Sequence, residues 1–139
     1  MLKSIPIMIL LNTLILLLSC NGRSGSGMKG DAGIAFKDSI MEFGELEFSG
    51  NGDCKFVFTN TGTTPLLVTH VRSTCGCTIP EWSEEPVNSR DTGTIYVSYD
   101  THRIGPFRKS IYVYSNAKNG TKQLYISGEV LRPEIAQRQ

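Results

Sequence analysis

Short runs of alternating apolar and polar residues dominate the chain from residue 34 onward, with glycine, asparagine, aspartate and proline interrupting them about every ten positions. The clearest runs are 54–58, 95–99 and 124–130. Successive side chains of a β-strand face opposite sides of a sheet, whereas the apolar positions of a helix recur every three or four residues. The sequence therefore predicts half-buried strands and shows no convincing helical stripe.

These runs also predict which side chains are buried. In the first of them, Phe56 and Phe58 are expected in the core and Lys55 in water. Further strands are expected near 34–43, 66–72 and 107–114, with turns at 60–62, 91–93, 105–106 and 118–120. Antiparallel strands without helices bury their apolar faces most economically as two packed sheets. We therefore expect an all-β, immunoglobulin-like antiparallel sandwich of about seven strands over residues 34–131.

Residues 1–19 have the form of a signal peptide. A single positive charge at Lys3 precedes an apolar run over 5–18. A bilayer-spanning helix needs about twenty apolar residues, so this run is too short to remain as an anchor. The ending Leu17-Leu18-Ser19-Cys20 resembles the bacterial lipobox, at which diacylglycerol is attached to the cysteine and the chain is cut before it. The resemblance implies that Cys20 is the lipidated mature N-terminus.

The two ends of the mature chain differ in composition from the predicted sandwich between them. Residues 20–33 hold five glycines and two serines, which predicts a flexible tether of about 20 Å, and 132–139 are expected to be a loose tail. Removal of residues 1–19 takes only one of the fourteen basic residues and leaves thirteen against thirteen acidic ones. This balance predicts no nucleic-acid partner. Because no basic cluster follows Cys20, attachment to the membrane must come from the acyl chains.

The distinctive local motif is Cys75-Gly76-Cys77-Thr78, which follows a predicted strand. It stands in order with other short motifs: Phe43-Gly44, Phe56, Phe58, Asn60-Thr61-Gly62, Pro65-Leu66, Pro80, Trp82, Gly93, Gly105, Phe107, Ser115-Asn116 and Gly128. In this order they resemble the bacterial domain-of-unknown-function family numbered fifteen seventy-three, whose secreted immunoglobulin-like domains are common in lipoproteins of the Bacteroidetes. The chain departs from the family at 89–91, where a Pro-Gly turn is usual. The resemblance implies a β-sandwich and no established activity.

Four interpretations of the two neighbouring cysteines remain open. A structural disulfide is favoured, because exported cysteines usually pair. The others are a soft-metal site formed by Cys75 and Cys77 with Cys54 or His70, a thiol-exchange pair, and inert buried thiols. A hairpin that sets Cys54 opposite Val71 would make Cys54 the disulfide partner of the loop. Two alternatives stay open: a direct Cys75–Cys77 bond, and Cys54 as a small core hydrophobe beside Phe56.

Other candidate residues favour structural roles. His70 and His102 lack a catalytic motif, and Trp82 is expected to cap the core. The carboxylates at 81, 84 and 85 are expected in a solvated loop. The tyrosines fall opposite the apolar faces of their strands, where they form either a binding face or ordinary strand surface: Tyr96, Tyr112, Tyr114 and Tyr125.

Together these features predict a lipid-anchored module of the cell envelope without enzymatic activity or cofactor. It is expected to hold the membrane through Cys20 and to bind a protein partner. Residues 21–23 carry no acidic cluster of the kind associated with surface export, which favours an outer-membrane position facing the periplasm. The alternative is a thiol-dependent protein that handles a metal or exchanges disulfides at Cys75 and Cys77.

Overall fold

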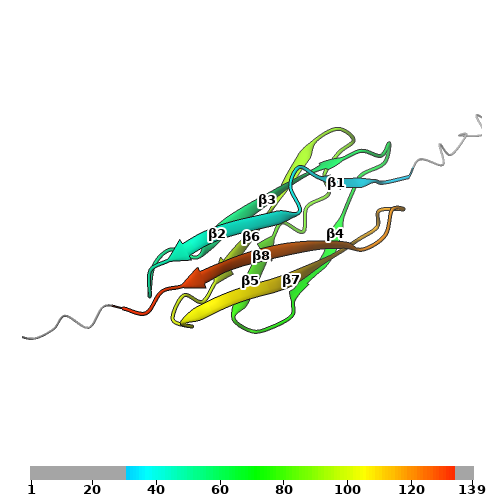
Figure 1. Cartoon of the computed structure of the whole chain (residues 1–139). Helices are drawn as coiled ribbons and strands as arrows, with labels where there is room; N and C mark the ends of the chain where they lie inside the picture. The colour runs from blue at the N-terminus through cyan, green and yellow to red at the C-terminus, as the bar shows by residue number, and fades with distance from the viewer. Residues whose placement is uncertain (1–30, 134–139) are drawn as a thin grey trace, which may run out of the picture.

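The structure is a computed structural model and describes residues 31–133. Eight strands form two four-stranded sheets that pack as a sandwich (Figure 1). The first sheet has the order β1 (Ile34–Phe36), β3 (Asp53–Asn60), β6 (Thr92–Tyr99) and β5 (Thr78–Trp82). The second has the order β2 (Ile40–Leu46), β8 (Lys122–Val130), β7 (Gly105–Ser115) and β4 (Val68–Ser73). The predicted all-β, immunoglobulin-like sandwich is confirmed, with one parallel pair, β2 with β8, among antiparallel neighbours.

Alternation along the strands fills the space between the sheets. Phe56 and Phe58 are buried and Lys55 is exposed, as predicted. Strands β6 and β8 alternate in the same way, and their inward side chains are Ile95, Val97, Tyr99, Leu124, Ile126 and Val130. These residues belong to one core cluster with contributions from both sheets, so the predicted faces of the three clearest strands are correct.

The predicted first strand is divided in two. After β1 the chain passes from one sheet to the other, so β1 pairs with β3 and β2 pairs with β8. Two predicted turn glycines lie instead in strands: Gly93 belongs to β6, and Gly105 begins β7 with a φ of 108°. A Cβ atom at Gly93 would lie 2.3 Å from the ring of Phe58, so glycine is needed there for packing and not for a turn.

The predicted hairpin between β3 and β4 is wrong. Thr59 pairs with Thr92 of β6, and Cys54 lies opposite Val97 instead of Val71. The connection that follows β3 crosses to the second sheet, where β4 pairs with β7. A turn signal between two alternating runs does not reveal whether the second run stays in the same sheet.

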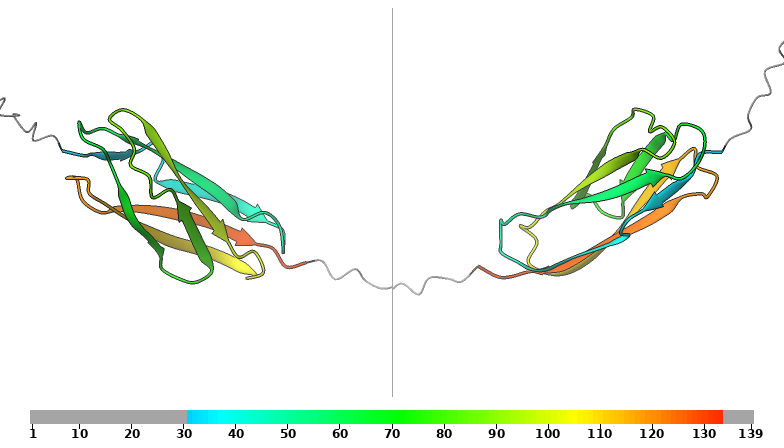
Figure 2. Two further views of the ribbon diagram at one scale, coloured as in Figure 1. Left: turned by 180° about the vertical axis from the view of Figure 1, so that it is seen from behind. Right: turned by 90° about the horizontal axis from the view of Figure 1, so that it is seen from above.

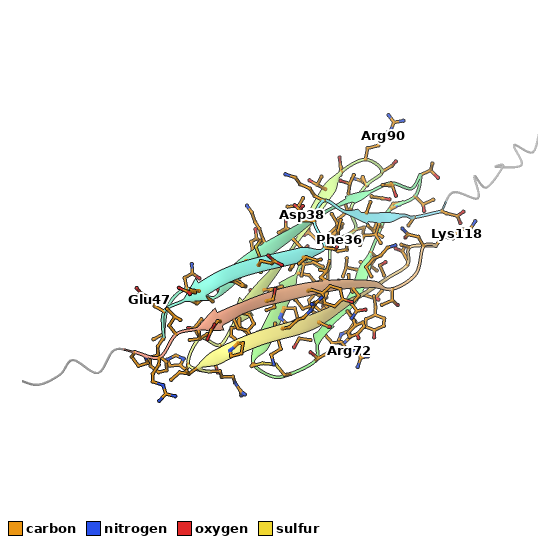
Figure 3. The ribbon with its side chains drawn as sticks, in the orientation of Figure 1. Phe36, Asp38, Glu47, Arg72, Arg90 and Lys118 are labelled. Carbon is orange, nitrogen blue, oxygen red and sulfur yellow. A yellow bond between two sulfur atoms is a disulfide. The ribbon has the colours of Figure 1, made fainter. Side chains whose placement is uncertain are left out.

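The two termini of the sandwich lie at opposite ends of its long axis (Figure 1). We call the end that carries Arg90 and Lys118 the tether end, and the end that carries Glu47 the far end (Figure 3). Lys118 Nζ donates to Asp31 Oδ2 at 2.9 Å, which ties the start of the described chain to the β7–β8 connection. Within residues 31–133 there is no helix of the length and hydropathy needed to span a membrane.

Candidate functional site

The Cys75-Gly76-Cys77 segment forms the connection by which the chain passes from β4 to β5, one strand in each sheet (Figure 2). Cys75 and Cys77 are joined by a disulfide, with their Cα atoms 5.3 Å apart. The expected bond from Cys54 is therefore wrong, and its rival is the bond that the structure contains. The reason is topological, because Cys54 lies on β3 and pairs across β6, whereas the hairpin that would have brought it to the loop does not exist.

Hydrogen bonds on both sides hold this connection in place. The N–H of Thr74 donates to the carbonyl of Ser110 at 3.1 Å, and the N–H of Asp100 donates to the carbonyl of Cys77 at 2.9 Å. The Ser73 hydroxyl contacts the carbonyl oxygens of Cys75 and Thr78 and donates to the latter at 2.8 Å. Thr101, the residue after Asp100, accepts a hydrogen bond at 3.2 Å from the N–H of Ser49, two residues after Glu47, so the contact with Asp100 places the loop toward the far end of the sandwich.

The two cysteine residues differ in exposure. Cys77 is 3% exposed, Cys75 is half-buried, and Gly76 between them is exposed. The hydroxyl of Thr78, a residue that is itself buried, lies 3.9 Å from both sulfur atoms. The described part of the chain gives this hydroxyl no other hydrogen-bond partner. A buried hydroxyl is therefore directed at the disulfide.

Cys54 is a free thiol that packs against the core. Burial, with a smaller contribution from the neighbouring Asp53 carboxylate, raises the pKa of Cys54 to about 11. The thiol is therefore protonated at neutral pH, and because the thiolate is the nucleophile, Cys54 is poorly suited to attack a disulfide or to bind a metal.

The four residues of the alternative metal site are not brought together. The sulfur atoms of Cys75 and Cys77 are bonded to each other, Cys54 lies on the other sheet from β4, and His70 is exposed on β4. His70 instead contacts aromatic rings, with centroid distances of 6.0 Å to both Trp82 and Tyr114. Residues 31–133 contain no group of three or more histidine, cysteine or acidic side chains arranged to hold a metal ion.

The structure also gives the surroundings of the remaining sequence candidates. Trp82 is half-buried at the end of β5 and packs against the core. Glu84 and Glu85 are exposed in the segment that follows β5, as expected, whereas Glu81 is exposed but lies in β5, opposite Tyr96, and not in a loop. Exposed His102 lies beside the Asp100 carboxylate, with Nδ1 3.1 Å from Oδ1, and hydrogen bonds from His102 lower the pKa of Asp100. Cys20 lies outside the described residues.

The tyrosines divide between the two outer faces of the sandwich. Tyr96 lies on the first sheet, where it is 57% exposed. The other three lie on the second sheet together with two arginines, and we call this set the Tyr–Arg face: Arg72, Arg108, Tyr112, Tyr114 and Tyr125 (Figure 3).

Each arginine of the Tyr–Arg face stacks on tyrosine. The Arg72 guanidinium carbon lies 5.3 Å from the ring centroid of Tyr112 and 5.7 Å from that of Tyr114. Arg108 lies 5.3 Å from Tyr125 in the same manner. Arg72 Nε also donates to the Tyr114 hydroxyl at 2.9 Å. Sequence reasoning missed the arginines because the register of β4 with β7, which sets Arg72 opposite Tyr112, is not visible in either strand alone.

Comparisons with solved structures agree on the fold. A protein of unknown function from Porphyromonas gingivalis W83 aligns with a TM-score of 0.65 and 10% identity over 71% of this chain and 47% of its own. PapD-like domain 7 of human CEP192 aligns with a TM-score of 0.63 and 12% identity over 75% and 89%. The VesB protease of Vibrio cholerae aligns with a TM-score of 0.57 and 11% identity over 70% and 32%.

At these identities the likeness concerns the fold alone, and the chain spans about half the length of the Porphyromonas protein. A search of the curated proteins found no match. The sequence itself matches the model of a family described as a protein of unknown function (DUF1573) over residues 34–130. Because this match covers more than half of the chain and every strand of the sandwich, the protein belongs to the DUF1573 family.

Proposed function

We propose that this protein is a binding module of the bacterial cell envelope, which holds a protein partner through the Tyr–Arg face without catalysis there. The observation that supports this proposal is the stacking of two guanidinium groups on three tyrosine rings on one outer sheet face. Tyrosine and arginine are enriched in protein interfaces and among the residues that contribute most to binding, because they combine large apolar area with polar edges.

The contacts within the face hold its side chains in place before binding. Arg72 is held by two rings and a hydroxyl, and Gln123 Nε2 donates to the Tyr112 hydroxyl at 3.2 Å. Ordering a long side chain when a complex forms normally weakens binding by about 0.5–1.5 kcal/mol for each side chain. Because these side chains are already held by contacts within the face, this unfavourable contribution to binding is smaller. Stacked guanidinium groups also keep N–H donors at their edges for carboxylates of a partner.

The anchor of this module in our proposal is a diacylglycerol-modified Cys20, with the protein on the outer membrane facing the periplasm. The lipobox resemblance at residues 17–20 supports the lipid, and the thirteen residues from 21 to 33 connect it to the sandwich. Arg72 lies on the side of the sandwich, away from Lys118 at the tether end (Figure 3), so in this proposal the anchor leaves the Tyr–Arg face open to a partner in the same compartment.

Replacing Cys20 with alanine, with residues 1–19 exchanged for an ordinary cleavable signal peptide, is expected to move the protein from the membrane fraction to the soluble fraction. The reason is that residues 21–33 contain no apolar run and no basic cluster that could act as an anchor. Fractionation of cells after a high-salt wash measures the effect, and metabolic labelling with a fatty acid tests the modification. A Cys54→Ala variant is the matched control and should remain in the membrane fraction. Membrane attachment of the Cys20→Ala protein after high salt would contradict the lipid anchor.

The Tyr–Arg face is tested with a partner captured by crosslinking in native membranes and then purified. We expect Arg72→Ala and Tyr114→Ala each to weaken its binding at least tenfold, as measured by titration calorimetry. Tyr96→Ala is the matched control, because it removes an exposed tyrosine from the outer face of the other sheet, and should change the Kd by less than about twofold. The reverse pattern, with loss only in Tyr96→Ala, would place the interface on the first sheet.

A further inference from the structure

The disulfide between Cys75 and Cys77 closes a ring with a single residue between its cysteines. A disulfide stabilises a fold mainly by restricting the unfolded chain, and the restriction is smallest for the shortest rings. The ends of this connection are also held independently, through hydrogen bonds from Thr74 to Ser110 and from Asp100 to Cys77. The bond is therefore not needed to keep the loop in place, and its reduction should leave the sandwich folded.

The site is asymmetric in the way that thiol exchange requires. Cys75 is half-buried next to exposed Gly76, so an incoming thiolate can reach its sulfur, whereas Cys77 is 3% exposed. Attack on Cys75 makes Cys77 the leaving group. The Thr78 hydroxyl, 3.9 Å from Cys77 Sγ, can donate to the thiolate that forms there. A buried charge without such a donor is costly, so this contact stabilises the thiolate that leaves. Because the hydroxyl is 3.9 Å from Cys75 Sγ as well, the direction of cleavage follows from the difference in exposure between the two cysteines and not from this contact.

We propose that Cys75 and Cys77 form a thiol–disulfide exchange site that oxidises a dithiol on an exported protein, an activity separate from binding at the Tyr–Arg face. A partner thiolate attacks Cys75 Sγ, the Cys75–Cys77 bond breaks, and Cys77 leaves as a thiolate that takes up a proton. The partner's second thiolate attacks its own bonded sulfur and releases Cys75, which is protonated in turn. The partner loses two electrons and two protons, and the Cys75–Cys77 pair gains both.

Two other features of the chain fit this assignment. Cys54, with its raised pKa, stays protonated at neutral pH and does not compete for the mixed disulfide. The loop lies toward the far end of the sandwich, through the contact between Cys77 and Asp100, and thus away from the end at which the described chain begins. A second protein can approach Cys75 there without displacing the tether.

The first test treats the purified full-length protein with dithiothreitol, a small dithiol that stands for the partner. We expect the Cys75–Cys77 bond to be reduced without denaturant, as measured by alkylation and peptide mass mapping. Near-ultraviolet circular dichroism should show that the reduced protein stays folded. A bond that resists reduction until the protein is unfolded, or a protein that unfolds on reduction, would overturn the proposal.

The second test compares two variants that both lack the disulfide. In Cys77→Ser the remaining Cys75 thiol should form a mixed disulfide with oxidised glutathione at least tenfold faster than the Cys77 thiol does in Cys75→Ser. Since neither variant has the bond, its loss cannot explain a difference between them. Equal rates, or faster reaction of Cys77, would overturn the assignment of Cys75 as the attacked sulfur.

The third test addresses the Thr78 hydroxyl. Thr78→Val keeps the shape of the side chain but removes the hydroxyl, and should slow reduction of the disulfide by dithiothreitol about fivefold to tenfold. Thr78→Ser keeps the hydroxyl and should stay within about twofold of the parent. An unchanged rate in a folded Thr78→Val protein would overturn the role given to this hydroxyl. The Tyr–Arg face is intact in all these variants, so failure here leaves the proposed binding function standing.

Discussion

Replacing Phe58 with alanine is expected to lower the free energy of unfolding by about 3 to 5 kcal/mol. Its ring is buried, lies over Gly93 of the neighbouring strand, and packs at a centroid distance of 5.6 Å from Phe36. Gly93 has no side chain to fill the space that the ring leaves, so the variant would contain a cavity between β3 and β6. Urea denaturation followed by circular dichroism measures the change. The dependence of the unfolding free energy on urea concentration should be the same in the variant and the parent, as expected if both unfold in two states.

The matched control for Phe58 is Lys55, which lies on the same strand but on its outer face. Lys55→Ala should change the free energy of unfolding by less than about 0.5 kcal/mol, because this side chain is exposed. Equal destabilisation by the two substitutions would mean that the inward face of β3 has been assigned wrongly.

A large loss of stability is also expected for Asn60→Ala, about 3 kcal/mol or more. Asn60 is fully buried, and its amide connects two loops to β3. Nδ2 donates to the carbonyls of Thr64 at 2.8 Å and Val87 at 2.9 Å, while Oδ1 accepts from Gly62 N–H at 2.9 Å. Alanine would leave these backbone groups without the partner at a site that water does not reach. Thermal and urea unfolding of the purified variant measure the loss.

Asn116 provides the control for Asn60, because its side-chain amide also bonds to backbone groups but the residue is exposed. Oδ1 accepts from Leu67 N–H at 2.8 Å, and Nδ2 donates to the Pro65 carbonyl at 3.1 Å. Water can replace the amide there, so Asn116→Ala should lower the free energy of unfolding by only about 1 kcal/mol. If both substitutions lower the free energy of unfolding by the same amount, burial does not increase the contribution of the Asn60 hydrogen bonds to stability.

Local pattern was sufficient to determine the class of fold and the buried faces of its clearest strands. Alternation with a period of two assigns each side chain to one face, so the core positions of β3, β6 and β8 were predictable residue by residue. The order of short motifs likewise pointed to the family whose model matches residues 34–130. The cysteines of the loop were recognisable as a candidate site from their spacing alone.

Only the tertiary structure decided what those residues meet. The strand that follows Asn60 pairs in the second sheet, because both sheets pack around one core. Cys54 therefore lies away from the loop, and Cys75 bonds with Cys77 instead. The same packing set the register that places Arg72 over two tyrosines. Pairing between strands depends on the apolar area that a whole sheet buries, so the sequence of a single strand does not show which strand it pairs with.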